Sequence, residues 1–149
     1  MATVSDLAGR RVYLDTNLFI YYLEDIAPYA ETLHSLFLAI ESSRQSAVTS
    51  QLTIAELLVK PLREGDDELK RACLRAVRTH AGLTVASIRR AVLVEAAAVR
   101  AAHGFGLADS IHASTARLSA CDVFLTNDER VRGIPGVTVL LLSELEVTS

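Results

Sequence analysis

Short apolar runs alternate with longer amphipathic stretches along almost the whole chain. Runs rich in β-branched and aliphatic residues are typical of buried strands, whereas apolar positions that recur every three or four residues indicate helices. The runs that we predict to be strands are 11–14, 46–50, 83–86, 123–126 and 137–142. Because helical stretches separate these runs, the pattern predicts an α/β fold, a three-layer α/β/α sandwich with a mainly parallel central sheet of about four to five strands.

The helical stretches contain residues that suit helix starts and stops. Pro28 suits the first turn of one helix, and Pro61 limits another that begins at Gln51. Ser87 is placed to cap a long helix that runs to about His103. The other helices are predicted over 18–23, from 66 onward, over 107–120 and over 129–132.

Composition and charge limit the classes of protein that fit. A chain of 149 residues, half of them hydrophobic, has the size of one ordinary globular domain, and it shows no linker, repeat or low-complexity run. We therefore expect a single domain over 1–149. The net charge of −3 provides no overall positive field, so binding of a polyanion would require local basic patches or metal ions.

The amino terminus and the cysteines indicate a reducing compartment. Residues 1–11 contain no apolar stretch of the kind found in signal peptides. Cys73 and Cys121 show neither a CxxC motif nor a metal-binding spacing, so we expect no disulfide framework and no structural zinc site. These features fit a cytoplasmic protein without a membrane span.

Four acidic residues stand out against this pattern of elements. Asp15 and Asp128 follow predicted strands, at the edge of a parallel α/β sheet where ligands bind. Asp109 lies in the first turn of a predicted helix, where any acid would favour the helix dipole, and Asp128 could cap a short helix. Glu56 has apolar neighbours in sequence, so we expect it to be at least partly buried, unless it lies on the one polar stripe of its helix. One shared acidic site accounts for all four positions together.

The chemistry of such a site follows from its charge. Four carboxylates at one place would repel one another, and their pKa values would rise unless a cation lay among them. An oxygen-only ligand set without thiolates selects hard ions such as Mg²⁺ or Mn²⁺. These ions polarise phosphoryl groups and activate water, and a pair of them can hold both the attacking and the leaving oxygen. The acids therefore point to hydrolysis of phosphodiester bonds.

Four motifs resemble those of the PIN-domain nucleases in their order and spacing. They are VYLDTN (12–17), LTIAEL (52–57), LADSIHA (107–113) and VFLTND (123–128). The likeness covers nearly the whole chain and is closest to the VapC toxins of bacterial toxin–antitoxin pairs. Each motif is weak alone, but the four in sequence are specific.

This resemblance implies a Mg²⁺- or Mn²⁺-dependent endoribonuclease. The acids that match the family's quartet are Asp15, Glu56, Asp109 and Asp128. By analogy Asp15 and Asp109 are the principal metal ligands, and the other two acids complete the metal site or hold water. The positions that support the acids are Thr16, Asn17 and Thr126. His112 falls where such sequences often carry a histidine outside the quartet, and we expect it to pack against or support the site.

The resemblance also implies partners. It predicts a homodimer, a VapB-like antitoxin whose carboxy-terminal segment approaches the acidic site, and a structured RNA substrate such as tRNA. The basic residues that could hold RNA are Lys60, Arg63, Arg71, Arg75 and Arg78. The last three line up on one face of a predicted helix, although such a row is more often a solvated face.

Two alternatives within the family stay open: a catalytically idle PIN fold that binds RNA or protein, and a solitary PIN nuclease without an antitoxin.

Other α/β folds with acids at strand ends fit less well. A receiver domain requires an adjacent acid pair and a late lysine, but Lys70 is the last lysine in the chain. A haloacid-dehalogenase-type phosphatase requires Asp-x-Asp after its first strand, where this chain has Asp15, Thr16 and Asn17.

Overall fold

The computed structural model describes residues 1–147. The strands of the main sheet are β2 (Arg11–Leu14), β3 (Ser46–Ser50), β4 (Leu83–Ala86), β5 (Val123–Thr126) and β6 (Thr138–Leu141). A two-stranded sheet pairs β1 (Ala2–Thr3) with β7 (Leu145–Glu146). The helices are α1 (Thr16–Leu23), α2 (Ala30–Glu41), α3 (Leu52–Leu57), α4 (Val59–Glu64), α5 (Asp67–Ala76), α6 (Arg90–His103) and α7 (Leu107–Leu118), with short 3-10 helices over Val4–Leu7 and Leu142–Glu144.

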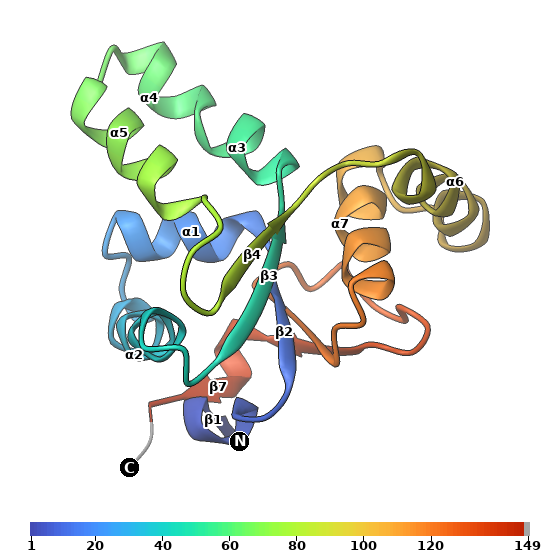
Figure 1. Ribbon diagram of the computed structural model, residues 1–149, viewed down its shortest axis with the longest axis horizontal. Coiled ribbons are helices and arrows are strands. Elements are labelled where there is room, and N and C mark those ends of the chain that lie inside the picture. The colour runs from blue at the N-terminus through green and yellow to red at the C-terminus, as the bar shows by residue number, and fades with distance from the viewer. Residues whose placement is uncertain (148–149) are drawn as a thin grey trace.

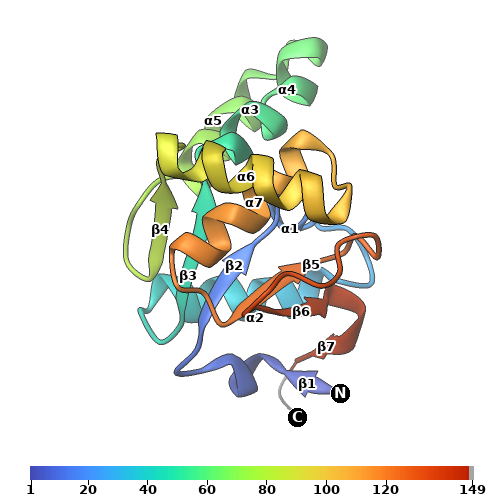
Figure 2. The ribbon, with the colours of Figure 1, turned by 90° about the vertical axis from the view of Figure 1, so that its right-hand side faces the viewer.

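The main sheet is parallel throughout, with the strand order β4-β3-β2-β5-β6. Figure 1 shows α1 and α2 on one side of this sheet and α6 and α7 on the other. The turned view of Figure 2 shows α6 and α7 stacked on the face that is turned to the viewer. The predicted three-layer α/β/α arrangement around a parallel sheet is confirmed.

Alternating side chains of the central strand β2 divide the core between the two faces. Val12 and Leu14 are fully buried in the cluster that they share with α1 and α2 side chains. Tyr13 points the other way, and its ring stacks on Phe124 with ring centroids 5.0 Å apart. A strand of a parallel sheet is buried on both faces, and this is why 12–14 reads as a continuous apolar run.

Two prolines occupy positions other than those predicted from the sequence. Pro28 lies in the turn before α2, which begins at Ala30. Pro61 does not limit the preceding helix: α3 ends at Leu57, and α4 holds Pro61 in its own first turn. There the missing N–H of proline costs no hydrogen bond. Helix α4 ends instead at Gly65, whose φ of 66° is left-handed and suits glycine.

One other predicted helix begins later than expected, and one helix prediction is wrong. Helix α6 begins at Arg90 rather than directly after Ser87, and residues 129–132 form no helix. In this segment the Asp128 carboxylate accepts hydrogen bonds from both the backbone N–H and the guanidinium of Arg130, so the chain turns back on Asp128. The pairing of β1 with β7 was not predicted either, because strands of two residues leave no periodic pattern.

Helices α6 and α7 pack against each other as the layer on the second face. Val92 and Ala96 of α6 bury against Ile111 of α7. In the described part of the chain, no single helix has the length and apolarity needed to cross a membrane. Helices α6 and α7 meet that criterion only when taken together, and the chain bends by 116° between them.

Candidate active site

The strand order brings the predicted acids to one edge of the sheet. Asp15 directly follows β2, and Asp128 lies just beyond β5, which pairs with β2 in parallel. Asp109 lies in the first turn of α7, close enough to Asp15 and Asp128 for their charges to raise its pKa. Glu56 comes from α3, and His112 Nε2 lies between it and Asp15, 2.6 Å from Glu56 Oε1 and 3.9 Å from Asp15 Oδ1. Four elements that are distant in sequence thus contribute one acid each.

Asp15 is buried and held by three donors. Its Oδ1 accepts the backbone N–H of Thr16 at 2.9 Å. Its Oδ2 accepts the hydroxyl of Thr126 at 2.7 Å and the side-chain amide of Asn17 at 3.4 Å. Only 6% of Asp15 is exposed, so this carboxylate has one fixed orientation.

Thr126 and Asn17 connect the ends of the two strands. The Thr126 hydroxyl, which donates to Asp15, accepts the N–H of Asp128 at 3.0 Å. The Asn17 side chain donates to Thr126 at 3.3 Å and accepts the N–H of Asn127 at 3.2 Å. The residues predicted to support the acids therefore contact the acids or the backbone that carries them.

Glu56 is less buried than its apolar neighbours in sequence predict. Its side chain keeps 35% of its area exposed. Its Oε1 accepts the hydroxyl of Thr16 at 2.7 Å and lies 2.6 Å from His112 Nε2. Partial burial raises the pKa of Glu56, but the hydrogen bonds from His112 and Thr16 outweigh it, so the net pKa lies below its usual value. Glu56 is therefore ionised at neutral pH.

Asp109 differs from the other acids, because no side-chain or backbone donor within residues 1–147 contributes a hydrogen bond to its carboxylate. Partial burial raises its pKa, and the negative charges of Asp15 and Asp128 raise it further. The positive charge of Arg130 offsets this rise only in part. The charge of Asp109 is thus left largely uncompensated by the protein.

Arg130 lies at the site, although nothing in the sequence singled it out. Its guanidinium binds Asp128 through two parallel hydrogen bonds, from Nε to Oδ1 at 3.0 Å and from Nη2 to Oδ2 at 2.8 Å. These bonds hold the pKa of Asp128 below its ordinary value. The Arg130 side chain is 84% exposed, so the pair adds little to stability and is easily separated. The periodicity of the sequence could not predict that Arg130 lies near the acids, because this residue is in a turn.

The site suits a hard divalent cation by its donor chemistry. Within residues 1–147, no group of three acidic, histidine or cysteine side chains lies close enough together to enclose a metal ion. The carboxylates of Asp15, Glu56 and Asp128 instead accept hydrogen bonds from other side chains of the protein. The available ligands are carboxylate oxygens, which Mg²⁺ and Mn²⁺ prefer. The partly buried, uncompensated carboxylate of Asp109 is the group that a cation would stabilise most.

The uncompensated charge of Asp109 leads to a prediction for the metal-free protein. We expect Asp109→Asn to raise the thermal midpoint at pH 7 in EDTA by about 2 °C, because the folded state no longer holds a desolvated charge beside two others. A raised pKa means that ionisation opposes folding, so the gain is full above the raised pKa. It vanishes as the pH falls below 3.8, where the wild-type carboxyl is protonated in both states.

Circular dichroism melts of the two proteins across this pH range provide the measurement. A midpoint of Asp109→Asn at or below that of the wild type at pH 7 would show that the protein already compensates this charge.

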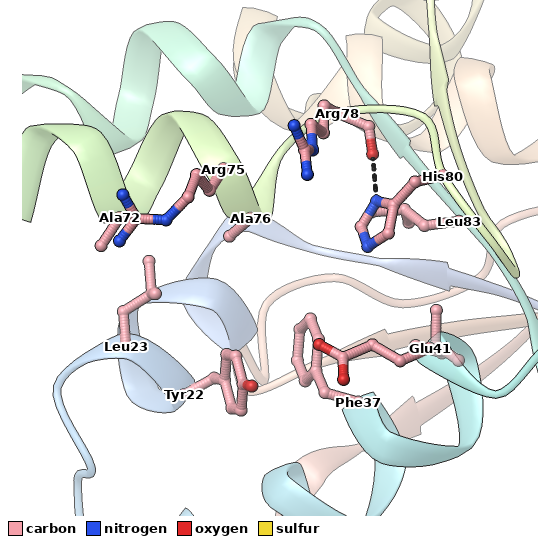
Figure 3. A pocket seen from close by; sticks show the side chains of 11 residues that line it. Tyr22, Leu23, Phe37, Glu41, Ala72, Arg75, Ala76, Arg78, His80 and Leu83 are labelled. Carbon is pink, nitrogen blue, oxygen red and sulfur yellow. Dashed lines mark hydrogen bonds between the residues drawn. The ribbon is translucent and has the colours of Figure 1, made fainter.

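The basic residues predicted to hold RNA are not gathered at one point. Those with exposed side chains along α4 and α5 and just after them are Arg63, Arg71, Arg75 and Arg78. Lys60 is engaged in an ion pair with an acid at the end of α1. Figure 3 shows Arg75 and Arg78 on one side of a cavity of about 320 Å³, with the rings of Tyr22 and Phe37 on the opposite side.

The fold and the acidic edge define a class of protein, the α/β sandwiches that carry acids at the carboxyl ends of a parallel sheet. Residues 12–137 match the PIN domain family. The chain belongs to this family, whose members are nucleases. No curated protein sequence matches the chain.

Solved structures with a similar fold include proteins of toxin–antitoxin systems. VapBC2 from Rickettsia felis, bound to a DNA fragment from its promoter, has a TM-score of 0.69 at 17% identity, over 88% of this chain and 98% of that chain. VapC20 from Mycobacterium tuberculosis, a sarcin-ricin loop cleaving toxin, has a TM-score of 0.62 at 14% identity, over 76% and 86%. DNA-bound VapBC from Salmonella typhimurium has a TM-score of 0.63 at 20% identity, over 89% and 98%. At these identities the likeness establishes the fold.

Proposed function

We propose that this protein is a metal-dependent endoribonuclease that hydrolyses RNA phosphodiester bonds. The observation that carries the proposal is Asp109, a partly buried carboxylate without a hydrogen-bond donor within 1–147 that lies near the charges of Asp15 and Asp128. This arrangement is unfavourable by itself and is relieved by a divalent cation. Membership of a nuclease family supports this use of the acids.

Asp15 and Asp109 would be the principal ligands of Mg²⁺ or Mn²⁺, and Glu56 and Asp128 would complete the site. When bound, the ion polarises the phosphoryl group and lowers the pKa of water. The fixed orientation of Asp15 removes the need to order that carboxylate during catalysis.

Glu56, which is ionised, can accept a proton at its free Oε2. The Arg130 guanidinium competes with a cation for Asp128 and, once released, is suited to bind a phosphate.

We propose that the RNA, with tRNA as one structured candidate, binds along the helices next to the acids. The cavity beside Arg75 and Arg78 adjoins a smaller one lined by Glu56 and Lys60, since Leu23 borders both. A phosphate backbone that followed this path would lead from the arginines to the acidic site. The proposed RNA contacts are Lys60, Arg63, Arg71, Arg75 and Arg78.

We propose further that the protein is the toxin of a VapBC pair, which acts as a homodimer in the cytoplasm and is inhibited by a VapB-like antitoxin. The likeness to the VapBC complexes of Rickettsia felis and Salmonella typhimurium supports such a partner. The free, buried cysteines Cys73 and Cys121 suit a reducing compartment. A small neighbouring reading frame that encodes a DNA-binding amino-terminal half would separate the toxin from a solitary nuclease.

The test of the activity is cleavage of total RNA by the purified wild type and by Asp109→Asn, each with Mn²⁺ and with EDTA. We expect discrete RNA products from the wild type in Mn²⁺ alone. Equal cleavage by both proteins would indicate a contaminant or a different site. If neither protein cleaves RNA while both are folded by circular dichroism, an idle PIN fold becomes the better description.

A further inference from the structure

A chain of buried polar groups runs from the middle of the sheet to the acidic site. The Tyr13 hydroxyl lies 2.6 Å from His112 Nδ1, and His112 Nε2 lies 2.6 Å from Glu56 Oε1. Tyr13 is fully buried, and only 1% of His112 is exposed. The three residues come from β2, α7 and α3, so only the folded chain connects them.

Packing alone does not account for these two polar side chains. A buried hydroxyl or imidazole is tolerated only when its polar atoms are paired, whereas an apolar side chain carries no such requirement. The Tyr13 ring stacks on Phe124 and meets His112 edge-on at a centroid distance of 5.8 Å. Phenylalanine would make the same ring contacts. The Tyr13 hydroxyl therefore contributes through its hydrogen bond to His112.

The direction of the hydrogen bonds follows from what each group can donate. A carboxylate only accepts, so His112 must present an N–H at Nε2 to Glu56. In a neutral imidazole Nδ1 is then an acceptor, and it faces Tyr13. The Tyr13 hydroxyl carries a proton that it can donate to Nδ1. Tyr13 and Glu56 therefore favour the same tautomer of His112.

We propose that His112 is a positioning residue for Glu56 and that Tyr13 in turn positions His112. The inference rests on the role of Glu56 in the proposed function. Thr16 and His112 both bind Oε1, which leaves Oε2 without a donor within 1–147 and free for a cation or a water molecule. The Glu56 side chain is 35% exposed, so without the bond from His112 only the Thr16 hydroxyl would hold its carboxylate in this orientation.

Asparagine and glutamine at position 112 separate positioning from packing. The amide of glutamine can place an N–H near the position of imidazole Nε2, whereas asparagine is too short to reach Glu56. We expect His112→Asn to weaken Mn²⁺ binding about 10- to 100-fold in titration calorimetry, as is typical when the partner of a metal ligand is lost. His112→Gln should recover most of that loss. Equal losses in the two variants, with both folded by circular dichroism, would overturn the proposal.

The tyrosine has its own matched pair of variants. Tyr13→Phe removes only the hydroxyl and should weaken Mn²⁺ binding less than His112→Asn does. Tyr29→Phe makes the same chemical change at a partly exposed ring that stacks on Tyr21, and it should bind Mn²⁺ like the wild type. If Tyr13→Phe also binds Mn²⁺ like the wild type, the role assigned to Tyr13 is wrong.

A second readout depends on neither metal nor RNA. Nitrogen-15 NMR shifts of the imidazole show which ring nitrogen carries the proton, and we expect His112 to carry it on Nε2 and not on Nδ1. Tyr13→Phe should shift the Nδ1 resonance, whereas Tyr29→Phe should not. A proton on Nδ1 in the wild type would overturn the assignment. If these results hold but RNA is not cleaved, the proposed function fails while the positioning of Glu56 stands.

Discussion

Replacement of Asp15 by asparagine is expected to lower the rate of RNA cleavage in Mn²⁺ by about 10³-fold, an effect of the size found when a fixed charge-stabilising group is removed from an active site. The amide keeps the shape of the carboxylate but carries no charge for a cation. Its NH₂ group would also oppose the N–H of Thr16 or force the Thr126 hydroxyl to turn. Both changes act at a side chain that is only 9% exposed, so it has little space in which to move.

Two measurements follow Asp15→Asn. The first is the single-turnover rate on a labelled RNA that contains a cleavage site found in the total-RNA test. The second is the rise of the thermal midpoint in Mn²⁺, which a ligand that binds only the folded state must cause. At a Mn²⁺ concentration about 100 times its Kd, the wild type should gain about 2.7 kcal/mol, or roughly 5 to 10 °C, and Asp15→Asn should lose most of this rise.

The matched control is Asp25→Asn, which makes the same chemical change at a surface carboxylate. The Asp25 side chain is 70% exposed and contacts His34. This variant should cleave RNA at the wild-type rate and keep the full rise in midpoint. Equal rises in Asp15→Asn and the wild type would remove Asp15 from the metal site, even if cleavage is lost.

Gly82→Ala is expected to cause the largest loss of stability, about 3 kcal/mol, because a methyl group has no space at this position. A Cβ on Gly82 would lie 2.2 Å from the carbonyl oxygen of Gln45 and 2.7 Å from that of Ile40. Both contacts are with backbone atoms, so no side chain can rotate away. The Gly82 N–H also donates to Ile40 O at 3.0 Å, and its carbonyl accepts the N–H of Ala47 at 2.9 Å. The methyl group would therefore separate β4 from the end of α2 and from β3.

Urea unfolding followed by circular dichroism measures this effect, and the thermal midpoint should fall by roughly 6 to 12 °C. Gly106→Ala is the matched control, because a Cβ there meets no atom within 4 Å and its φ of −63° is open to any residue. Its cost should stay near 1 kcal/mol, the usual difference at the start of a helix. Similar losses in the two variants would mean that the Gln45 and Ile40 carbonyls move aside without much cost.

The parts of this fold that local patterns encode could be predicted from the sequence. The apolar run 11–14 and the run 123–126 are strands because a parallel sheet buries both faces of each strand. The placement of Asp15 and Asp128 at the strand ends follows from the same runs, and Asp109 follows from the glycine break before α7. In each case the residues that predict the structure are neighbours in the sequence.

What the tertiary structure alone decided depends on contacts between residues far apart in the chain. His112 is bonded to Tyr13, 99 positions away, and to Glu56, 56 positions away, and no periodicity links such positions. The exposure of Glu56 is set by how α3 packs rather than by its apolar sequence neighbours. The two hydrogen bonds from the Arg130 guanidinium to Asp128 depend on the backbone conformation of the turn that carries both residues. The positions of the acids along the chain were thus local information. The hydrogen bonds that lower the pKa values of Glu56 and Asp128, and the partial burial that raises the pKa of Asp109, exist only once the chain has folded.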